Sequence, residues 1–179
     1  SLSLKDAKEL YTMPMRFFPH TPSLDNYYWL FKCLPEWPTY FKNSIITTVG
    51  TVAMTVFCAF LMGYAFARIS FRARDLIFYS LIAAMFVPQI GLLMAQYEVL
   101  HVLDLRNSLL GLILLFSSNL GVPVFIMRQT FMSMPGEIED AARIDGASRL
   151  RLLLEIALPF ATSGMLIVAT LTFVNVWGE

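Results

Sequence analysis

Four stretches without a charged side chain constrain this chain more than any other feature of its sequence. They hold 25, 22, 21 and 23 residues and lie between Lys42 and Arg68, Asp75 and Glu98, Arg106 and Arg128, and Glu155 and Glu179. A helix needs about 20 apolar residues to cross the hydrocarbon core of a bilayer. One such stretch is compatible with a buried helix of a large soluble protein, but four in 179 residues predict membrane spans.

The composition indicates the same class of protein. Charged residues make up 15% of the chain and hydrophobic residues 57%, whereas about 25% of a soluble domain is charged. The 13 basic and 13 acidic residues cancel, so no general positive field favours nucleic acid as a partner. Two cysteines are too few for a disulfide framework, and the first 40 residues lack the apolar run of a signal peptide. We therefore expect an all-α integral membrane protein, a polytopic helix bundle with four visible spans surrounded by lipid.

Neutral polar side chains interrupt the predicted spans. Polar groups in hydrocarbon need hydrogen-bond partners, so such residues usually face other helices or a wet cavity. The bulkiest amides in three different stretches are Gln89, Asn119 and Asn175. We expect them to face the bundle, either as contacts between helices or along a solute path. Pro88 and Pro123 should kink the second and third spans, because proline removes a backbone donor and crowds the preceding turn.

The basic residues near the predicted membrane ends orient the spans. One side has seven arginines, at positions 68, 72, 74, 128, 143, 149 and 151, and the other has Lys32, Lys42 and Arg106. The side richer in basic residues is normally cytoplasmic. This places residues 1–42 outside the membrane as an extracytoplasmic loop segment, followed by a transmembrane domain over 43–179 with a cytoplasmic loop at 128–159.

The outer segment and the two chain ends carry further expectations. Five prolines and several tyrosines and tryptophans before position 43 suit a loop at a membrane–water interface. The chain does not begin with Met and stops at the end of the fourth apolar stretch. We therefore expect an internal piece of a longer membrane protein with at least one earlier span.

The loop at 128–155 has the pattern of a short helix. Pro135 suits the first helical position, with Ser133 or Met134 as the cap. Acidic residues follow in the opening turns, where they favour the helix dipole. Glu139 and Arg143 are four residues apart with the acid first, the favourable order for an ion pair.

The second half of this loop is richer in small residues. Ala142 and Gly146 would share a face of the helix, and small residues let another surface approach closely. Gly146 is also placed to end or bend the helix. A second helical stretch should then run over 147–158 until Pro159. A surface helix that merely connects two spans is the simplest alternative interpretation.

The same loop resembles the signature of the permease subunits of ABC importers. That signature reads Glu-Ala-Ala, three residues, Gly, nine residues, Ile-x-Leu-Pro, and the sequence matches its spacing with Asp140-Ala141-Ala142, Gly146 and Ile156-Ala157-Leu158-Pro159. The one departure is Asp140 in place of Glu, which keeps the charge on a shorter side chain. Glu139 beside it offers a second carboxylate.

Shorter segments make the chain similar to the carbohydrate-uptake branch of that family, close to the maltose-type second permease subunit. They are Glu139–Ser148, Leu24-Asp25-Asn26-Tyr27, Asn43-Ser44, Val87-Pro88 and Trp177-Gly178-Glu179. The resemblance covers roughly residues 15–179. The loop motif is specific and the other segments support it.

The resemblance implies a fold, a set of partners and a division of labour. Permeases of this family usually have six spans, of which this chain would hold the second to the fifth. The expected partners are cytoplasmic ATP-binding subunits, a second permease subunit and an extracytoplasmic solute-binding protein. The loop would be the coupling helix that contacts the ATPase, through Glu139, Asp140, Ala141, Ala142, Asp145 and Gly146. The whole would import a sugar or related polyol by alternating access across the cytoplasmic membrane of a prokaryote.

Other chemistries find little support in the residues. No phosphate-binding Gly-rich loop ending in Gly-Lys-Ser/Thr occurs, so ATP hydrolysis is expected on separate subunits and this chain is not expected to be an enzyme. No metal-ligand spacing occurs either, and we expect no cofactor. His20 and His101 stand alone in predicted outer loops.

Two further classes of membrane protein remain as alternatives. None of the four stretches contains His, Asp or Glu, which disfavours an intramembrane enzyme and an ion-coupled secondary transporter. Sodium sites built from neutral oxygens escape this test, so the secondary transporter and a purely structural multi-pass protein stay open.

Overall fold

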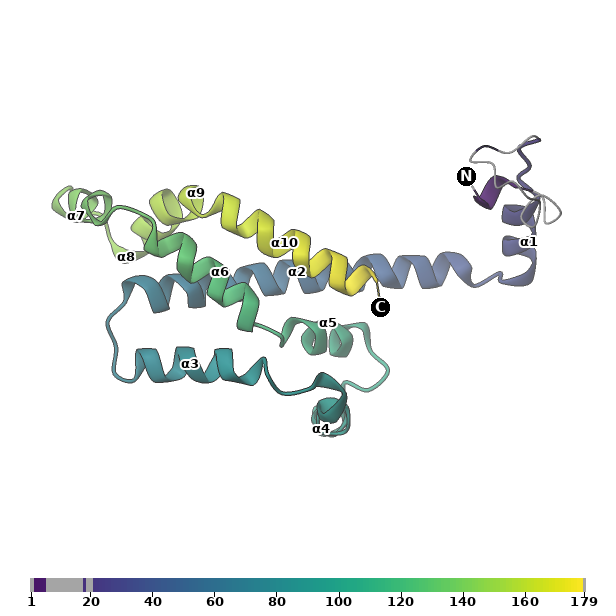
Figure 1. The fold of residues 1–179 in the computed structure, drawn as a ribbon, viewed down its shortest axis with the longest axis horizontal. Helices are drawn as coiled ribbons and strands as arrows, with labels where there is room; N and C mark the ends of the chain where they lie inside the picture. Colours follow the sequence, from purple (N-terminus) through teal and green to yellow (C-terminus); the bar gives the residue numbers. More distant parts are fainter. Residues whose placement is uncertain (1, 6–17, 19–20, 179) are drawn as a thin grey trace. The chain divides into compact units, whose positions relative to one another are not determined.

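The computed structural model describes residues 2–5, 18 and 21–178, and most of these are helical (Figure 1). No strand occurs in this part of the chain, and the expected all-α fold is confirmed. The chain divides into two compact units, Ser1–Ile45 and Ile46–Glu179. Pro14, Pro19 and His20, which the sequence places in the outer loop, lie outside the described residues.

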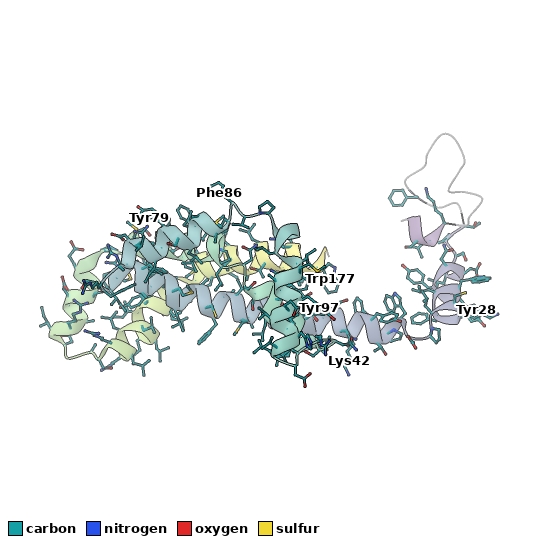
Figure 2. All side chains as sticks on the ribbon, turned by 90° about the horizontal axis from the view of Figure 1, so that it is seen from below. Tyr28, Lys42, Tyr79, Phe86, Tyr97 and Trp177 are labelled. Atoms are coloured by element: carbon teal, nitrogen blue, oxygen red, sulfur yellow. The ribbon has the colours of Figure 1, made fainter. Side chains whose placement is uncertain are left out.

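The first unit contains a short aromatic helix. Its elements are η1 (Leu2–Leu4), α1 (Asp25–Cys33) and the first turns of α2. The side-chain amide of Asn26 donates to the backbone carbonyls of Ser3 and Lys5, each at 2.9 Å. These two bonds hold η1 against α1. Tyr28 and Trp29 on α1 remain exposed, and Tyr28 is labelled in Figure 2.

Helix α2 (Trp37–Arg68) is the first predicted span and is long and apolar enough to cross a membrane. It packs closely against α6 (Gly121–Met132) in the second unit. A Cβ added at Gly63 would lie 2.9 Å from the backbone carbon of Met127, so the absence of a side chain at Gly63 sets this close approach. Phe60 and Phe131 meet edge to face beside it, with ring centroids 5.5 Å apart. Val124, Met127 and Phe131 of α6 are fully buried in this core.

The second predicted span is two helices rather than one, so that prediction is wrong. Helix α3 (Arg74–Ala84) ends at Met85, and α4 (Gln89–Val102) begins after Pro88. Pro88 does not kink a continuous helix but precedes α4 with an extended backbone, φ −59° and ψ 124°. Proline lacks the amide hydrogen that a helix interior requires, and its ring disfavours helical geometry in the residue before it. The break at 85–88 follows from both effects.

The third predicted span is bent, but Pro123 is not where it bends. Helix α5 (Leu109–Ser117) and α6 meet at 55° across residues 118–120. Pro123 lies in the first turn of α6, where backbone amides have no partner within the helix. The prediction of a kink at Pro123 is therefore wrong, because proline is tolerated at that place.

The fourth predicted span also belongs to a bent pair. A helical rod made of α8 (Arg149–Leu152), a π-helical turn (Leu153–Ala157) and α9 (Leu158–Phe160) meets α10 (Thr162–Trp177) at 69°. The described residues thus contain one helix able to span a membrane, or up to three if each bent pair is one span, rather than four.

Helix α6 is central in the second unit, with contacts to α3 on one side and α10 on the other. The guanidinium of Arg128 lies 4.2 Å from the centre of the Phe78 ring on α3. A Cβ added at Gly164 of α10 would lie 3.1 Å from Cβ of Thr130. Outside this core, apolar side chains face away from the protein: Tyr79 and Phe86 are 63% and 85% exposed and project from the bundle in Figure 2. Such a surface suits a lipid environment.

Candidate functional site

The loop helix forms as predicted, but it starts one residue later. Helix α7 (Gly136–Ile144) has Pro135 as its N-terminal cap, and no side chain accepts a hydrogen bond from its first turn. The Ser133 hydroxyl instead donates to the carbonyl of Thr130 at 2.8 Å and so belongs to the end of α6. The prediction of Ser133 or Met134 as the cap is therefore wrong.

The end of α7 confirms the role predicted for Gly146. Gly146 has φ +78°, and its backbone amide donates to the backbone carbonyl of Arg143 at 3.1 Å. The backbone amide of Ala147 donates to the backbone carbonyl of Ala142 at 2.9 Å. This pair of bonds is the Schellman motif, which ends a helix at a left-handed glycine. Gly146 therefore lies beyond the helix and does not share a helical face with Ala142, contrary to the prediction.

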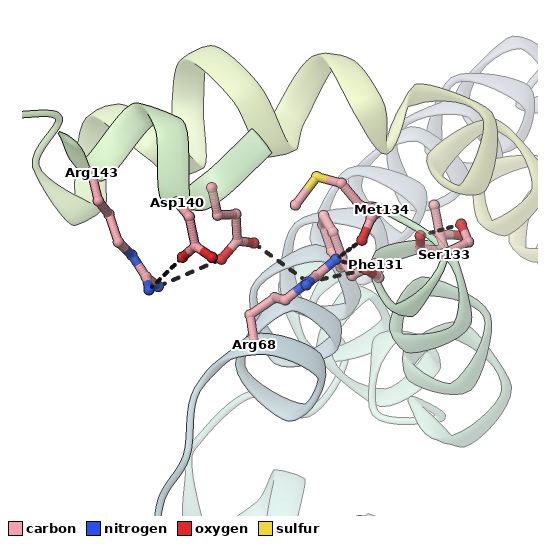
Figure 3. A network of polar contacts seen from close by, with 8 residues as sticks. Arg68, Phe131, Ser133, Met134, Asp140 and Arg143 are labelled. Carbon is pink, nitrogen blue, oxygen red and sulfur yellow. Dashed lines mark hydrogen bonds and ion pairs between the residues drawn. The ribbon is translucent and has the colours of Figure 1, made fainter. Parts of the chain in front are cut away.

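Acidic and basic side chains link α7 to the rest of the second unit (Figure 3). Glu139 is 4% exposed, and its carboxylate lies 3.5 Å from a terminal nitrogen of Arg143 and 3.4 Å from Nε of Arg68. The predicted Glu139–Arg143 pair is thus confirmed. Asp140 is exposed and lies 3.5 Å from Arg143. The contact of Arg68 with this loop was not predicted, because no local pattern connects two residues across 70 intervening positions.

The six residues predicted to contact an ATPase divide into an outer and an inner group. Asp140, Ala141, Asp145 and Gly146 are exposed, Ala142 is half-buried, and Glu139 faces inward. Ile144, which the sequence analysis did not single out, is 87% exposed at the end of α7. A Cβ added at Gly146 would meet no atom within 4 Å. The outward surface of α7 is thus open and includes small residues, and it is flanked by the large apolar side chain of Ile144.

A cavity of about 610 Å³ lies among α2, α4, α5, α6 and α10, and apolar side chains make up most of its lining. Its polar lining consists of neutral side chains, namely Thr55, Gln96, Ser118, Asn119, Thr172 and Asn175. Two of the three predicted amides therefore line one cavity. The side chain of the third, Gln89, lies outside the described residues. Gln96 also lines this cavity but was not among the predicted path residues, although it interrupts the same charge-free stretch as Gln89.

The break between α5 and α6 supplies one wall of this cavity. Asn119 lies in that break, where the regular helical hydrogen bonding is interrupted for a few residues. Irregular backbone at membrane depth is tolerated where it is buried in protein or lines a water-filled cavity. The Thr55 hydroxyl is buried and has no hydrogen-bond partner among the described residues. No ionisable side chain lines the described cavity, and its six polar side chains can form hydrogen bonds with a ligand that carries hydroxyl groups.

The described residues offer no grouping suited to metal binding. Within that part of the chain, no three His, Cys, Asp or Glu side chains come together. His101 is exposed on α4. The cavity and the outward surface of α7 are therefore the two candidate sites.

Comparison with known proteins gives the context of both sites. Residues 39–179 match the family described as binding-protein-dependent transport system inner membrane component. The sulfoquinovosyl glycerol transport system permease protein SmoH of Agrobacterium fabrum is 35% identical, with 99% of this chain and 62% of SmoH covered. The arabinooligosaccharides transport system permease protein AraQ of Bacillus subtilis is 29% identical, with 99% of this chain and 63% of AraQ covered.

A solved structure shares the fold. It is described as the crystal structure of a bacterial ABC transporter involved in the import of the acidic polysaccharide alginate. The match has a TM-score of 0.84 and 21% sequence identity and covers 100% of this chain and 62% of that chain. This chain thus spans a little over three fifths of the length of these similar proteins.

Proposed function

The chain belongs to the family of binding-protein-dependent transport system inner membrane components, and on that premise we propose that it is the permease subunit of an ATP-driven importer. The observation that carries the proposal is the cavity in the helix bundle, with neutral hydrogen-bonding side chains from several helices around it. Such a cavity can hold a polar solute away from lipid. As a transport subunit, the chain moves solute and leaves ATP hydrolysis to its partners.

The solute we propose is a sugar or a related polyol. Two relatives are described as transport permeases for sulfoquinovosyl glycerol and arabinooligosaccharides. Amides both donate and accept hydrogen bonds, and hydroxyls do the same, so the side chains of Asn119, Asn175 and Gln96 match a solute rich in hydroxyl groups. The lack of an ionisable group in the described lining favours a neutral solute.

The partners we propose follow from the family and from α7. They are cytoplasmic ATP-binding subunits, a second permease subunit and an extracytoplasmic solute-binding protein. The exposed surface of α7, with Asp140, Ala141 and the protruding Ile144, would contact an ATP-binding subunit together with Gly146 just beyond the helix. Its small residues permit close approach, and its carboxylates can pair with basic groups of the partner.

The bent helices suit a transport cycle by alternating access. The break at 118–120 places Ser118 and Asn119 in the lining of the cavity, and α10, which follows the second bend, lines it with its later turns. Chain breaks of this kind let two helical halves tilt separately, so the cavity can open to one side and then to the other. We place the protein in the cytoplasmic membrane of a prokaryote, crossing it several times, with α2 as its longest span.

Reconstitution of the intact permease with its partner subunits tests the proposal. In proteoliposomes, uptake of the cognate sugar should require ATP and the solute-binding protein and should persist when ion gradients are collapsed. A sodium or proton gradient that drives uptake without ATP would contradict the proposal and favour the secondary transporter.

A further inference from the structure

Arg68, the last residue of α2, contacts three separate elements of the second unit (Figure 3). Its Nε and a terminal nitrogen donate to the carbonyl of Phe131 in α6, at 3.1 and 2.7 Å. A terminal nitrogen also donates to the carbonyl of Met134, just beyond α6. Nε lies 3.4 Å from the carboxylate of Glu139 on α7. One guanidinium therefore joins the ends of α2 and α6 to the loop helix.

The chemistry of this junction requires arginine. The carbonyls at the end of a helix lack partners within the helix and carry partial negative charge, so a cation there is favourable. The planar guanidinium presents five donors in a fixed fork and can serve those carbonyls and a carboxylate together. A lysine ammonium is a compact point charge and cannot span the same set in this geometry.

Burial distinguishes this ion pair from the others near α7. The side chains of Arg68 and Glu139 are 16% and 6% exposed, whereas those of Arg151 and Glu155 are 63% and 60% exposed and pair at 2.8 Å. Exposed pairs contribute little because solvent screens them. Removing one partner of a buried pair leaves an uncompensated charge and is strongly unfavourable. The Arg68–Glu139 pair therefore resists separation in a way that the Arg151–Glu155 pair does not.

We infer that Arg68 and Glu139 are positioning residues that couple a displacement of α7 to the ends of α2 and α6. The inference rests on the proposed function, because it takes α7 to be the element that the ATP-binding subunits move. Glu139 faces inward and Asp140 outward, so adjacent acids on one helix have different roles. The outward acid is available to the partner, and the inward acid transmits the movement through Arg68 to two helices that line the cavity.

The test measures solute imported per ATP hydrolysed by the reconstituted complex. Glu139→Gln keeps the size of the side chain but removes its charge, and Arg68→Gln/Glu139→Gln removes both charges together. We expect roughly a tenfold lower ratio in both variants, within the range of known coupling effects, with complex assembly retained in the double variant. Glu155→Gln, which breaks the exposed pair, is the matched control and should stay within about twofold of the unaltered complex.

Each other outcome has a defined meaning. A normal ratio of solute to ATP in Glu139→Gln or in the double variant would overturn the inference. Loss of assembly in both would assign the pair to folding alone and would also overturn it. Failure of the unaltered complex to import solute with ATP would instead contradict the proposed function, so the two failures can be told apart.

Discussion

At the scale of single residues, the cavity brings together polar side chains that the sequence places in separate apolar stretches. Asn119 comes from the α5–α6 break and Asn175 from α10, and both line the same space. A side-chain amide left unpaired in an apolar environment costs roughly 2–7 kcal/mol, depending on the reference state. Facing a cavity that can hold water or a solute gives the amides hydrogen-bond partners that lipid cannot supply.

Replacement of each amide by leucine separates solute contact from packing. In Asn119→Leu and Asn175→Leu, we expect the apparent affinity for the solute to fall by roughly tenfold, because a lost hydrogen bond leaves a polar group of the solute unpaired. Assembly of the complex should survive. Uptake and ATPase activity, measured side by side, check this.

The control for the amide variants is Gln129→Leu. Gln129 is exposed on α6 and does not line the cavity. It should keep the affinity of the unaltered protein. Reduced assembly of the Asn119→Leu and Asn175→Leu variants with unchanged solute preference would indicate packing alone, and normal transport in both would contradict any role for these amides.

At the scale of elements, α7 is a short helix with a defined start, a glycine at its end and an open outer surface. Its end depends on a left-handed backbone at Gly146, which most side chains adopt only at a cost of about 1–2 kcal/mol. Close approach of a partner to its outer surface depends instead on the absence of a large side chain at this position. Gly146 contributes both to the end of the helix and to the open surface. Replacing it with a small and with a large side chain separates the backbone effect from the surface effect.

A pair of substitutions at Gly146 makes that separation. Gly146→Ala and Gly146→Trp carry a similar backbone cost, and neither Cβ meets an atom within 4 Å in this chain. We expect the alanine variant to retain its ATP-binding subunit and most of its transport, and the tryptophan variant to lose both. Co-purification of the ATP-binding subunit is the measurement. Normal co-purification and transport with tryptophan would exclude this surface as the contact.

At the scale of the whole molecule, basic residues gather at one end of the second unit. The end of α2, the start of α3, the connection between them, the end of α6 and helices α7 and α8 lie at this end in Figure 1. They carry all seven of the arginines that the sequence assigns to the cytoplasm. The α4–α5 connection at the opposite end carries Arg106. This asymmetry is the pattern expected of a membrane protein with α7 in the cytoplasm.

Labelling with a membrane-impermeant thiol reagent tests that orientation. In a background where Cys33 and Cys58 are replaced, we expect His101→Cys to react in intact cells and Arg72→Cys to react only after permeabilisation. Both positions are exposed in the structure, so access to the reagent depends on the side of the membrane. Labelling of position 72 alone in intact cells would reverse the topology.

The sequence by itself determined the class of protein, the presence of the loop helix and the glycine that ends it. Several charge-free stretches of about 20 residues in one chain are rare outside membrane spans, so the helical membrane fold could be inferred from the sequence alone. Helix dipoles, the Glu139–Arg143 spacing and the glycine at 146 act within a few residues, so the course of α7 was also predictable from local pattern. The error of one residue at its start arose because Ser133 bonds backward to α6 rather than forward.

Only the tertiary structure decided where the spans break and what the polar residues face. Pro88 and Pro123 look alike in sequence, yet one separates two helices and the other lies harmlessly in a first turn, because the effect of proline depends on which amides already lack partners. The same holds for the cavity, which needs α2, α4, α5, α6 and α10 around one space. The Arg68–Glu139 contact likewise joins residues 71 positions apart in sequence, and such a contact exists only once α2 and α6 have packed through Gly63.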